Sequence, residues 1–303
     1  NIALDGVYQG WHGEKWTVKA AMPAARYALA AAAAGGKVYA LGGYTTTPVA
    51  TNTEYDPVTN AWTTKTALPA ASDGLGAVAV GDLVHAFGGE NTGGPLNTHR
   101  TYNPATNAWT TMPALSTVRV GMAFASLGDT VYSIGGSEAP PAVATVEAFS
   151  PGASAWSAKT SLPAARGGFA AATVNGKIYA FGGGNSVGTV LADVDEYDPA
   201  TGLWTAKAPL PAARYELPAG AIGGKVYVIG GRTPSNADIS LNEEFDPAAN
   251  TWATRTPMPT PRMRLGAAVL NGKLYAVGGS TGTRVAVNEE FDPGTAQVFT
   301  GLT

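Results

Sequence analysis

Short apolar runs recur along the chain at a nearly constant interval, and each ends at a pair of glycines. The pairs stand at 42–43, 88–89, 135–136, 182–183, 230–231 and 278–279, with steps of 46, 47, 47, 48 and 48 residues. Apolar runs of this length, rich in β-branched and aromatic residues and followed by glycine, predict β-strands. A repeat of this period predicts an array of similar supersecondary units.

Three further features keep the same register. A run of small apolar residues precedes each strand that ends in glycine. A strand ending in Asx-Pro or Ser-Pro follows it, and a tryptophan stands six residues after that Asx or Ser in five repeats: Trp62, Trp109, Trp156, Trp204 and Trp252. Proline ends a strand because it lacks the amide donor of the ladder. We therefore predict four strands in each repeat, with the small residues innermost, where strands crowd around an axis.

The two ends of the chain complement each other. Trp16 lies six residues before Met22-Pro23, as Trp62 does before Leu68-Pro69, whereas the sixth repeat carries Val298 in place of the tryptophan. Residues 14–19 are therefore expected to supply the outer strand of the sixth unit and to remove an exposed sheet edge. The alternative closure uses residues 298–299 and leaves Trp16 outside the ring.

The double glycine, the spaced aromatic residue and the later tryptophan resemble the kelch repeat over nearly the whole chain. The resemblance implies an all-β, six-bladed β-propeller of four-stranded antiparallel blades. A solenoid is the alternative, but its end repeats would need to be atypical. The expected organisation is a single domain over residues 1–303, with blades at about 24–68, 70–115, 117–162, 164–210, 212–258 and 260–298, the last completed by residues 14–19.

Composition narrows the function only slightly. The 303 residues carry a net charge of −3 and no cysteine, which gives no reason to expect nucleic-acid binding, disulfides or thiolate metal sites. Since no apolar run reaches about 18 residues, membrane insertion is not expected. The start without methionine and the Ala/Thr/Gly-rich composition favour a secreted, extracellular or periplasmic bacterial domain whose flanking segments are missing. We expect a monomer with no cofactor.

Most of the polar residues are expected to be structural. His85 replaces a repeated tyrosine and should be a packed ring, while His12 and His99 have no metal-ligand spacing. The acids that recur beside the Asx-Pro steps should hydrogen-bond within the scaffold, because an active site needs asymmetry: Glu54, Glu196, Glu244 and Glu290. Their neighbours Asp195, Glu243 and Glu289 are expected on solvated strand faces.

The candidate binding face lies where one blade connects to the next. Sixteen residues before five of the glycine pairs stand arginines that could ring one end of the channel, with Ser72 at the sixth position: Arg26, Arg119, Arg166, Arg214 and Arg262. The alternative is that each guanidinium binds loop carbonyls between blades. Two positions later the blades carry Ala28, Gly74, Gly121, Gly168, Glu216 and Arg264. Glu216 and Arg264 form either a simple ion pair or part of a ligand site.

Kelch propellers that bind peptides use this face, together with the loops after the glycine pairs. The intervening residues Tyr27, Asp73 and Tyr215 add aromatic and acidic character to the candidate face. The resemblance adds the loops, three of which begin at Tyr44, Glu90 and Arg232. Those loops vary in length and sequence while the frame repeats, as expected where loops carry recognition.

Three functions remain open. The first is a non-catalytic binding module that recognises a protein segment or a carbohydrate. The second is a small-molecule enzyme similar to the kelch-type sialic acid mutarotases, with Glu216 as acid/base and an arginine as carboxylate clamp. The third is an inert or engineered scaffold, against which the unequal loops and Ser72 argue.

Overall fold

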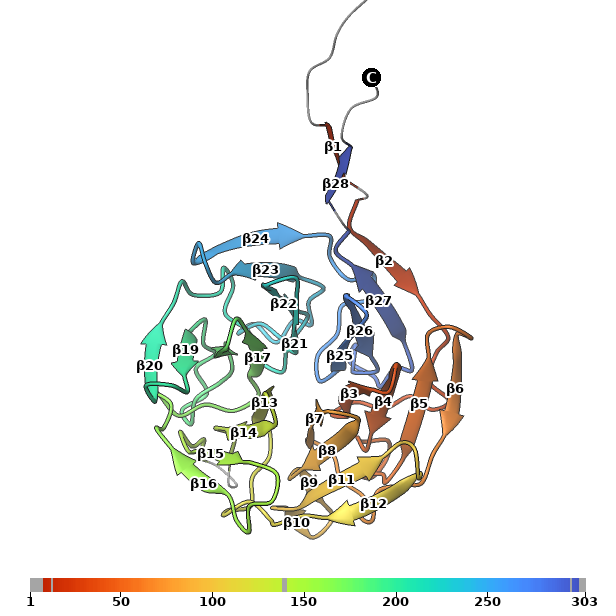
Figure 1. The fold of residues 1–303 in the computed structure, drawn as a ribbon, viewed down its shortest axis with the longest axis vertical. Helices are drawn as coiled ribbons and strands as arrows, with labels where there is room; N and C mark the ends of the chain where they lie inside the picture. The colour runs from red at the N-terminus through yellow and green to blue at the C-terminus, as the bar shows by residue number, and fades with distance from the viewer. Residues whose placement is uncertain (1–7, 12, 138–140, 295, 300–303) are drawn as a thin grey trace, which may run out of the picture.

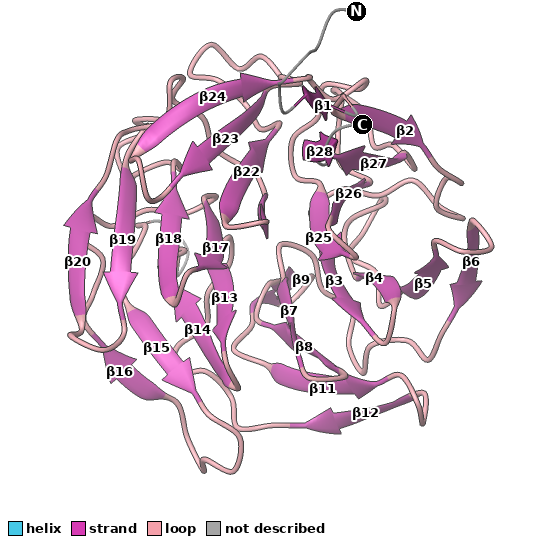
Figure 2. Ribbon diagram, turned by 45° about the horizontal axis from the view of Figure 1, so that its top comes forward, coloured by secondary structure: helices cyan, strands magenta, loops and turns pink. Residues whose placement is uncertain are grey.

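The computed structural model describes residues 8–11, 13–137, 141–294 and 296–299, and within these ranges the chain forms strands, turns and loops without a helix. Six four-stranded antiparallel sheets surround a central axis as the blades of a propeller (Figure 1). The six-bladed all-β prediction is confirmed. In the tilted view each blade has one edge strand nearest the axis and the other edge strand at the rim (Figure 2).

The blades follow one another along the chain. Blade 1 contains β3 (Ala30–Ala34), β4 (Lys37–Leu41), β5 (Asn52–Asp56) and β6 (Ala61–Thr64). Blade 2 contains β7 (Gly76–Val80), β8 (Leu83–Phe87), β11 (His99–Asn103) and β12 (Ala108–Thr111). Blade 3 contains β13 (Ala123–Leu127), β14 (Thr130–Ile134), β15 (Val146–Phe149) and β16 (Ser157–Lys159). Blade 4 contains β17 (Ala170–Val174), β18 (Lys177–Phe181), β19 (Val194–Asp198) and β20 (Leu203–Ala206). Blade 5 contains β21 (Ala219–Ile222), β22 (Lys225–Ile229), β23 (Asn242–Asp246) and β24 (Thr251–Arg255). A short pair, β9 (Glu90–Asn91) and β10 (Gly94–Pro95), extends the loop of blade 2.

Blade 6 joins the two ends of the chain. It contains β25 (Gly266–Leu270), β26 (Lys273–Val277) and β27 (Asn288–Asp292), and its outer strand is β2 (Lys15–Val18). Trp16 pairs with Phe291 in the register that Trp62 and Tyr55 adopt in blade 1. The predicted closure by the N-terminal strand is confirmed. The alternative is wrong, because β28 (Ala296–Phe299) pairs with β1 (Tyr8–Trp11) in a separate two-stranded sheet.

The outer-strand tryptophans fasten each blade to the one before it. Each indole donates a hydrogen bond to a carbonyl that follows the preceding outer strand, over 2.7–3.0 Å, from Trp16, Trp62, Trp109, Trp156, Trp204 and Trp252. Trp16 bonds Thr256 of blade 5, and Trp62 bonds Ala20 beyond β2. The seam at the chain ends therefore repeats the other five.

The glycine pairs allow adjacent blades to approach closely. Gly42, Gly135 and Gly230 have φ of +58°, +56° and +57°, a conformation that side chains rarely adopt. A Cβ on Gly230 would lie 2.6 Å from the carbonyl oxygen of Arg262 in the next blade. The next amide, of Gly231, donates to that same carbonyl at 2.9 Å. Gly42, Gly135 and Gly230 therefore combine a positive φ with no room for a side chain.

Apolar side chains fill the space between neighbouring blades. One buried cluster joins Ala31 and Val38 of blade 1 to Tyr275 and Val277 of blade 6, and similar clusters lie between the other blades. Small residues on the inner strands and rings toward the rim match a wedge-shaped gap that widens outward. This packing holds the loops at the channel end in fixed positions.

Candidate functional site

Six residues, one from each blade, line the cavity at one end of the channel, and we call them the neck: Ala28, Gly74, Gly121, Gly168, Glu216 and Arg264. All six have left-handed backbones, with φ between +51° and +62°. Amide-to-carbonyl hydrogen bonds of 2.5–3.0 Å link five of the six neighbouring pairs. Within the described chain, only the step between Gly74 and Gly121 lacks such a bond. The neck is therefore a rigid backbone frame from which three side chains project.

The left-handed conformation makes those three side chains notable. Among the described residues, the other non-glycine residues with positive φ are all asparagines, which tolerate this region better than other residues do. Ala28, Glu216 and Arg264 instead carry a strain of about 1 kcal/mol or more each. Three blades relieve it with glycine. The fold therefore does not require a charged side chain at the neck.

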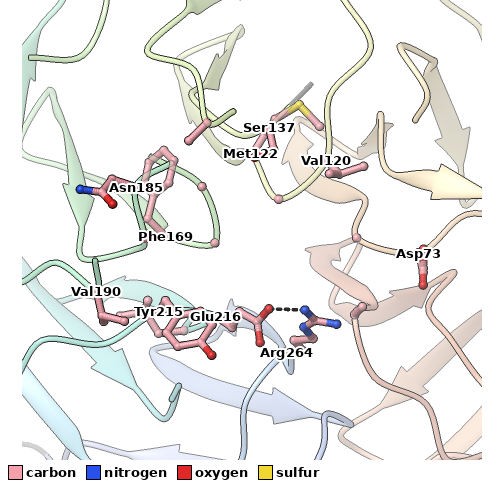
Figure 3. A pocket seen from close by; sticks show the side chains of 18 of the residues that line it. Asp73, Val120, Met122, Ser137, Phe169, Asn185, Val190, Tyr215, Glu216 and Arg264 are labelled. Carbon is pink, nitrogen blue, oxygen red and sulfur yellow. Dashed lines mark ion pairs between the residues drawn. The ribbon is translucent and has the colours of Figure 1, made fainter. Parts of the chain in front are cut away.

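Glu216 and Arg264 form an ion pair across neighbouring blades (Figure 3). The Arg264 side chain is 43% exposed, and its guanidinium also lies 5.8 Å from the ring centroid of Tyr27. Burial is the largest single influence and lowers the pKa of Arg264, but the hydrogen bond to Glu216 and the charges of Glu216 and nearby acidic groups together raise the pKa above its usual value. Because Arg264 binds the Glu216 carboxylate, this arrangement does not present Glu216 as a free general acid/base.

A second tier of residues surrounds the neck. In each blade, the residue before the neck residue forms a β-bridge with the first residue after the glycine pair. The six bridges are Tyr27–Tyr44, Asp73–Glu90, Val120–Ser137, Gly167–Gly184, Tyr215–Arg232 and Met263–Ser280. The frame is sixfold, but its chemistry is not. Blade 1 presents two aromatic rings, blade 2 two acids, and blades 3 and 4 small or apolar residues.

A cavity of about 730 Å³ opens over the neck, and we call it the mouth cavity. Its wall includes the neck, Asp73, Glu90, Tyr215 and apolar side chains such as Met122 and Phe169, several of which appear in Figure 3. Asn185, Ser186, Pro234 and Asn236 from the loops after the glycine pairs also line it. Residues 138–140 of the equivalent blade 3 loop lie outside the described residues.

A second cavity of about 750 Å³ lies beside the first, with Arg264 on the border of both. Its lining combines Tyr27 and Tyr44, whose ring centroids are 5.3 Å apart, with Arg232 and Arg284. Arg232 is paired with Asp238 at 2.8 Å, and Arg284 donates to the carbonyl of Thr45 at 3.2 Å. The face is thus aromatic and basic near blade 1 and acidic over blade 2.

The five repeated arginines do not reach this face. Their side chains are at most 1% exposed: Arg26, Arg119, Arg166, Arg214 and Arg262. The expectation of a ligand-facing ring is not met, because each guanidinium turns into its own blade and binds backbone carbonyls in its strands or directly beside them. The alternative interpretation is right that these arginines bind backbone carbonyls, but the carbonyls belong to the same blade and not to the junction between two blades.

Four of these arginines are neutralised by buried acids, and this corrects a second expectation. The ion pairs are Arg119–Glu147, Arg166–Asp195, Arg214–Glu243 and Arg262–Glu289. Asp195, Glu243 and Glu289 were expected on solvated faces, yet they are at most 8% exposed. Arg26 has Thr53 as its partner instead, at 2.7 Å, and burial lowers its pKa to about 10.

The other repeated acids hydrogen-bond within the scaffold, as expected. The hydroxyls of Tyr39, Tyr179 and Tyr275 donate to Glu54, Glu196 and Glu290, and Arg255 binds Glu244 through two nitrogens at 3.0 Å.

His85 and His99 form a buried pair within blade 2. His99 is the first residue of β11 and is fully buried. Its Nδ1 lies 3.3 Å from the carbonyl of Pro113, which can only accept, so its Nε2 accepts from His85 Nδ1 at 2.9 Å. Burial lowers the pKa of His85 to about 4, and burial with the charge of His85 lowers the pKa of His99 to about 3. Both rings are neutral at pH 7, while His12 lies outside the described residues.

No metal site is found in the part of the chain that the structure describes, where no three or more His, Cys, Asp or Glu residues gather as ligands. The same ranges contain no helix with the length and apolar character needed to cross a bilayer.

The closed ring of four-stranded blades with double-glycine turns defines a β-propeller of the kelch type. Comparison with family models places residues 121–297 in the KLHDC2/KLHL20/DRC7 Kelch-repeats domain and residues 25–69 in the Kelch motif. The chain belongs to the kelch-repeat family. A search of curated proteins finds no match. Kelch propellers are commonly protein-interaction modules.

Proposed function

We propose that this protein is a binding module that captures a segment of a partner protein in the mouth cavity, with Arg264 and Glu216 as its central contacts. One observation carries the proposal: two ionisable residues occupy strained left-handed positions where three other blades have glycine. Strain of this kind persists where surrounding structure enforces it, and it concentrates at functional sites. Three blades form the same backbone frame with glycine at this position, so the frame does not require either charged side chain.

The size of the mouth cavity supports a segment as the ligand. A volume of about 730 Å³ lies within the range of roughly 300–1,000 Å³ typical of small-ligand pockets. It accommodates a few side chains, and the adjoining cavity beyond Arg264 gives an extended chain room to continue over Tyr27 and Tyr44. The combination of a rigid frame, aromatic rings and an exposed arginine is typical of the anchor points of interfaces.

A selection experiment tests this proposal. A library of random displayed peptides is enriched on the immobilised protein, and the affinity of the best peptide is measured by fluorescence polarisation for the wild type and for Arg264→Ala. Loss of one charge-assisted hydrogen bond should cost about 1.5–3 kcal/mol, or about 10–150-fold in affinity. Asp82→Asn is the control, since this exposed residue lies at the other end of inner strand β7.

Three results would contradict the proposal, and a fourth would change the class of its ligand. The first is a selection in which every enriched peptide binds Arg264→Ala as tightly as the wild type. The second is binding to the opposite face or to the outer rim. The third is turnover: the protein would equilibrate the anomers of sialic acid, and Glu216→Gln would abolish this activity with little loss of affinity for the sugar. That result would favour the enzyme over the binding module. Selective retention of a glycan by the mouth, without any peptide, would replace a protein segment by a carbohydrate.

A further inference from the structure

Asp73 and Glu90 lie opposite each other in a β-bridge, and both line the mouth cavity. Their backbones form a bridge through two hydrogen bonds, from Asp73 to Glu90 at 2.9 Å and from Glu90 to Asp73 at 2.8 Å. Like charges directly opposite each other in a β-bridge destabilise it. The equivalent bridges of the other blades contain no second pair of like charges.

Neither carboxylate has the partner that such a pair would need. In the described ranges of the chain, no lysine or arginine forms an ion pair with Asp73 or Glu90. Asp73 is only 7% exposed, and its Oδ1 is the one buried carboxylate oxygen among the described residues that lacks a hydrogen-bond partner. The buried acids that pair with arginines show how the same scaffold otherwise neutralises a carboxylate.

Arg264, the arginine that shares the mouth cavity with these acids, does not neutralise Asp73 or Glu90. The guanidinium of Arg264 is engaged by Glu216 and lies over the ring of Tyr27. The charged residues that line the mouth cavity are therefore three acids against one arginine. Burial, followed by the charge of Glu90, raises the pKa of Asp73 to about 6 in spite of Arg264. A buried acceptor without a donor costs about 1–3 kcal/mol or more when it is charged.

We infer that Asp73 and Glu90 form a subsite for the side-chain ammonium or guanidinium group of a lysine or arginine in the bound protein segment. This inference rests on the proposed function and names the chemistry of its ligand. A lysine offers three donors and an arginine five, and either cation beside Asp73 and Glu90 would relieve the repulsion between the two acids. Because Ca²⁺ takes 6–8 oxygen ligands and no group of three or more ligand residues gathers within the described ranges, an organic cation fits better than a metal ion.

The cation subsite would give the bound segment a preferred orientation on this face. The cation subsite lies over blade 2, whereas Tyr27, Arg232 and Arg284 surround the second cavity on the other side of Arg264. A segment that crosses the neck would place its basic residue at Asp73 and a neutral, aromatic or acidic residue beyond Arg264. Opposite polarity at the two ends fixes the orientation of the bound chain.

The test uses peptides selected on the wild-type protein and made with and without their basic residues. Each lysine is replaced by norleucine and each arginine by citrulline, which removes the charge and keeps the length. We expect the best peptides to carry lysine or arginine, and we expect Asp73→Asn to weaken them at least 10-fold and Glu90→Gln by a smaller factor. The norleucine or citrulline peptide should bind the wild type and Asp73→Asn equally. Asp82→Asn is the matched control, and the thermal unfolding of every variant is recorded.

The outcomes separate the two proposals. If no selected peptide depends on Arg264, the proposed function itself fails. If peptides depend on Arg264 but contain no basic residue, or bind Asp73→Asn as tightly as the wild type, only the cation subsite is overturned. Stoichiometric competition by calcium or magnesium chloride that requires Asp73 would replace the organic cation by a metal ion.

Discussion

Replacement of Asp73 by asparagine should stabilise the unliganded protein, which is unusual for a change at a buried position. The two side chains have nearly the same shape, so packing is retained while the charge is removed. The pKa of Asp73 rises from 3.8 to about 6 in the fold, and each unit corresponds to about 1.4 kcal/mol. At pH 7 the ionised carboxylate therefore costs up to about 3 kcal/mol. Since the buried amide must itself find partners, we expect a gain of about 1–3 kcal/mol.

The pH dependence provides a second signature of the same group. An acid whose pKa is raised on folding favours the native state at low pH, and this contribution is lost as the pH rises. For Asp73 the loss falls between about pH 4 and pH 6. The difference in free energy of unfolding between Asp73→Asn and the wild type, measured by urea denaturation, should be smallest near pH 4 and largest at pH 7. An Asp73→Asn variant less stable than the wild type at pH 7, or a difference independent of pH, would refute the reasoning.

The remaining predictions concern the scaffold. Deletion of residues 1–20 should lower the thermal midpoint of the whole domain, because the deletion removes the outer strand of blade 6; an unchanged midpoint would contradict closure. Gly230→Ala should cost more than about 1 kcal/mol of stability in urea denaturation, since its Cβ would meet the Arg262 carbonyl at 2.6 Å; a neutral effect would show that the blades yield. His99→Asn should flatten the loss of stability between about pH 6.5 and pH 3. The lowered pKa values of His85 and His99 favour the native state above the unfolded pKa and fail as the pH falls; an equal acid slope in the variant would assign that loss to other groups.

The repeat in the sequence is sufficient to predict the frame. Glycine pairs, Asx-Pro steps and tryptophans act through the backbone of their own strand or its neighbour, so their spacing alone specifies strand order and closure. Trp16 is the clearest case. Its distance from Met22-Pro23 predicts an outer strand, and the indole hydrogen bond to Thr256 places it there.

The arginines show where prediction from spacing stops. Spacing places Arg119 and its equivalents at the channel end of a blade, but it does not determine whether a long side chain turns outward or back into its own sheet. A signal was nonetheless present in the sequence. An acid follows four of the arginines after 27–29 residues, and blade 2, which has Ser72 in place of arginine, has Arg100 at the position of the acid. That reciprocal change indicates a buried ion pair.

The neck could be predicted only in part. The unequal residues at 216 and 264 stand out against glycine in three blades, and the structure brings them together. Their left-handed backbones and the missing partner of Asp73 Oδ1 depend on three-dimensional packing between blades. No pattern of residue types along the chain records either feature.

The double variant Glu216→Gly/Arg264→Gly tests the central claim most directly. It gives both blades the residue that blades 2 to 4 already carry, relieves two strained backbones and removes a partly exposed ion pair worth about 0–1 kcal/mol. The measurement is the free energy of unfolding alongside the affinity for a peptide selected on the wild type. We predict stability equal to or above that of the wild type and a loss of binding of at least 10-fold. Unfolding or marked destabilisation with binding retained in the folded fraction would show that the pair serves the scaffold and not a ligand.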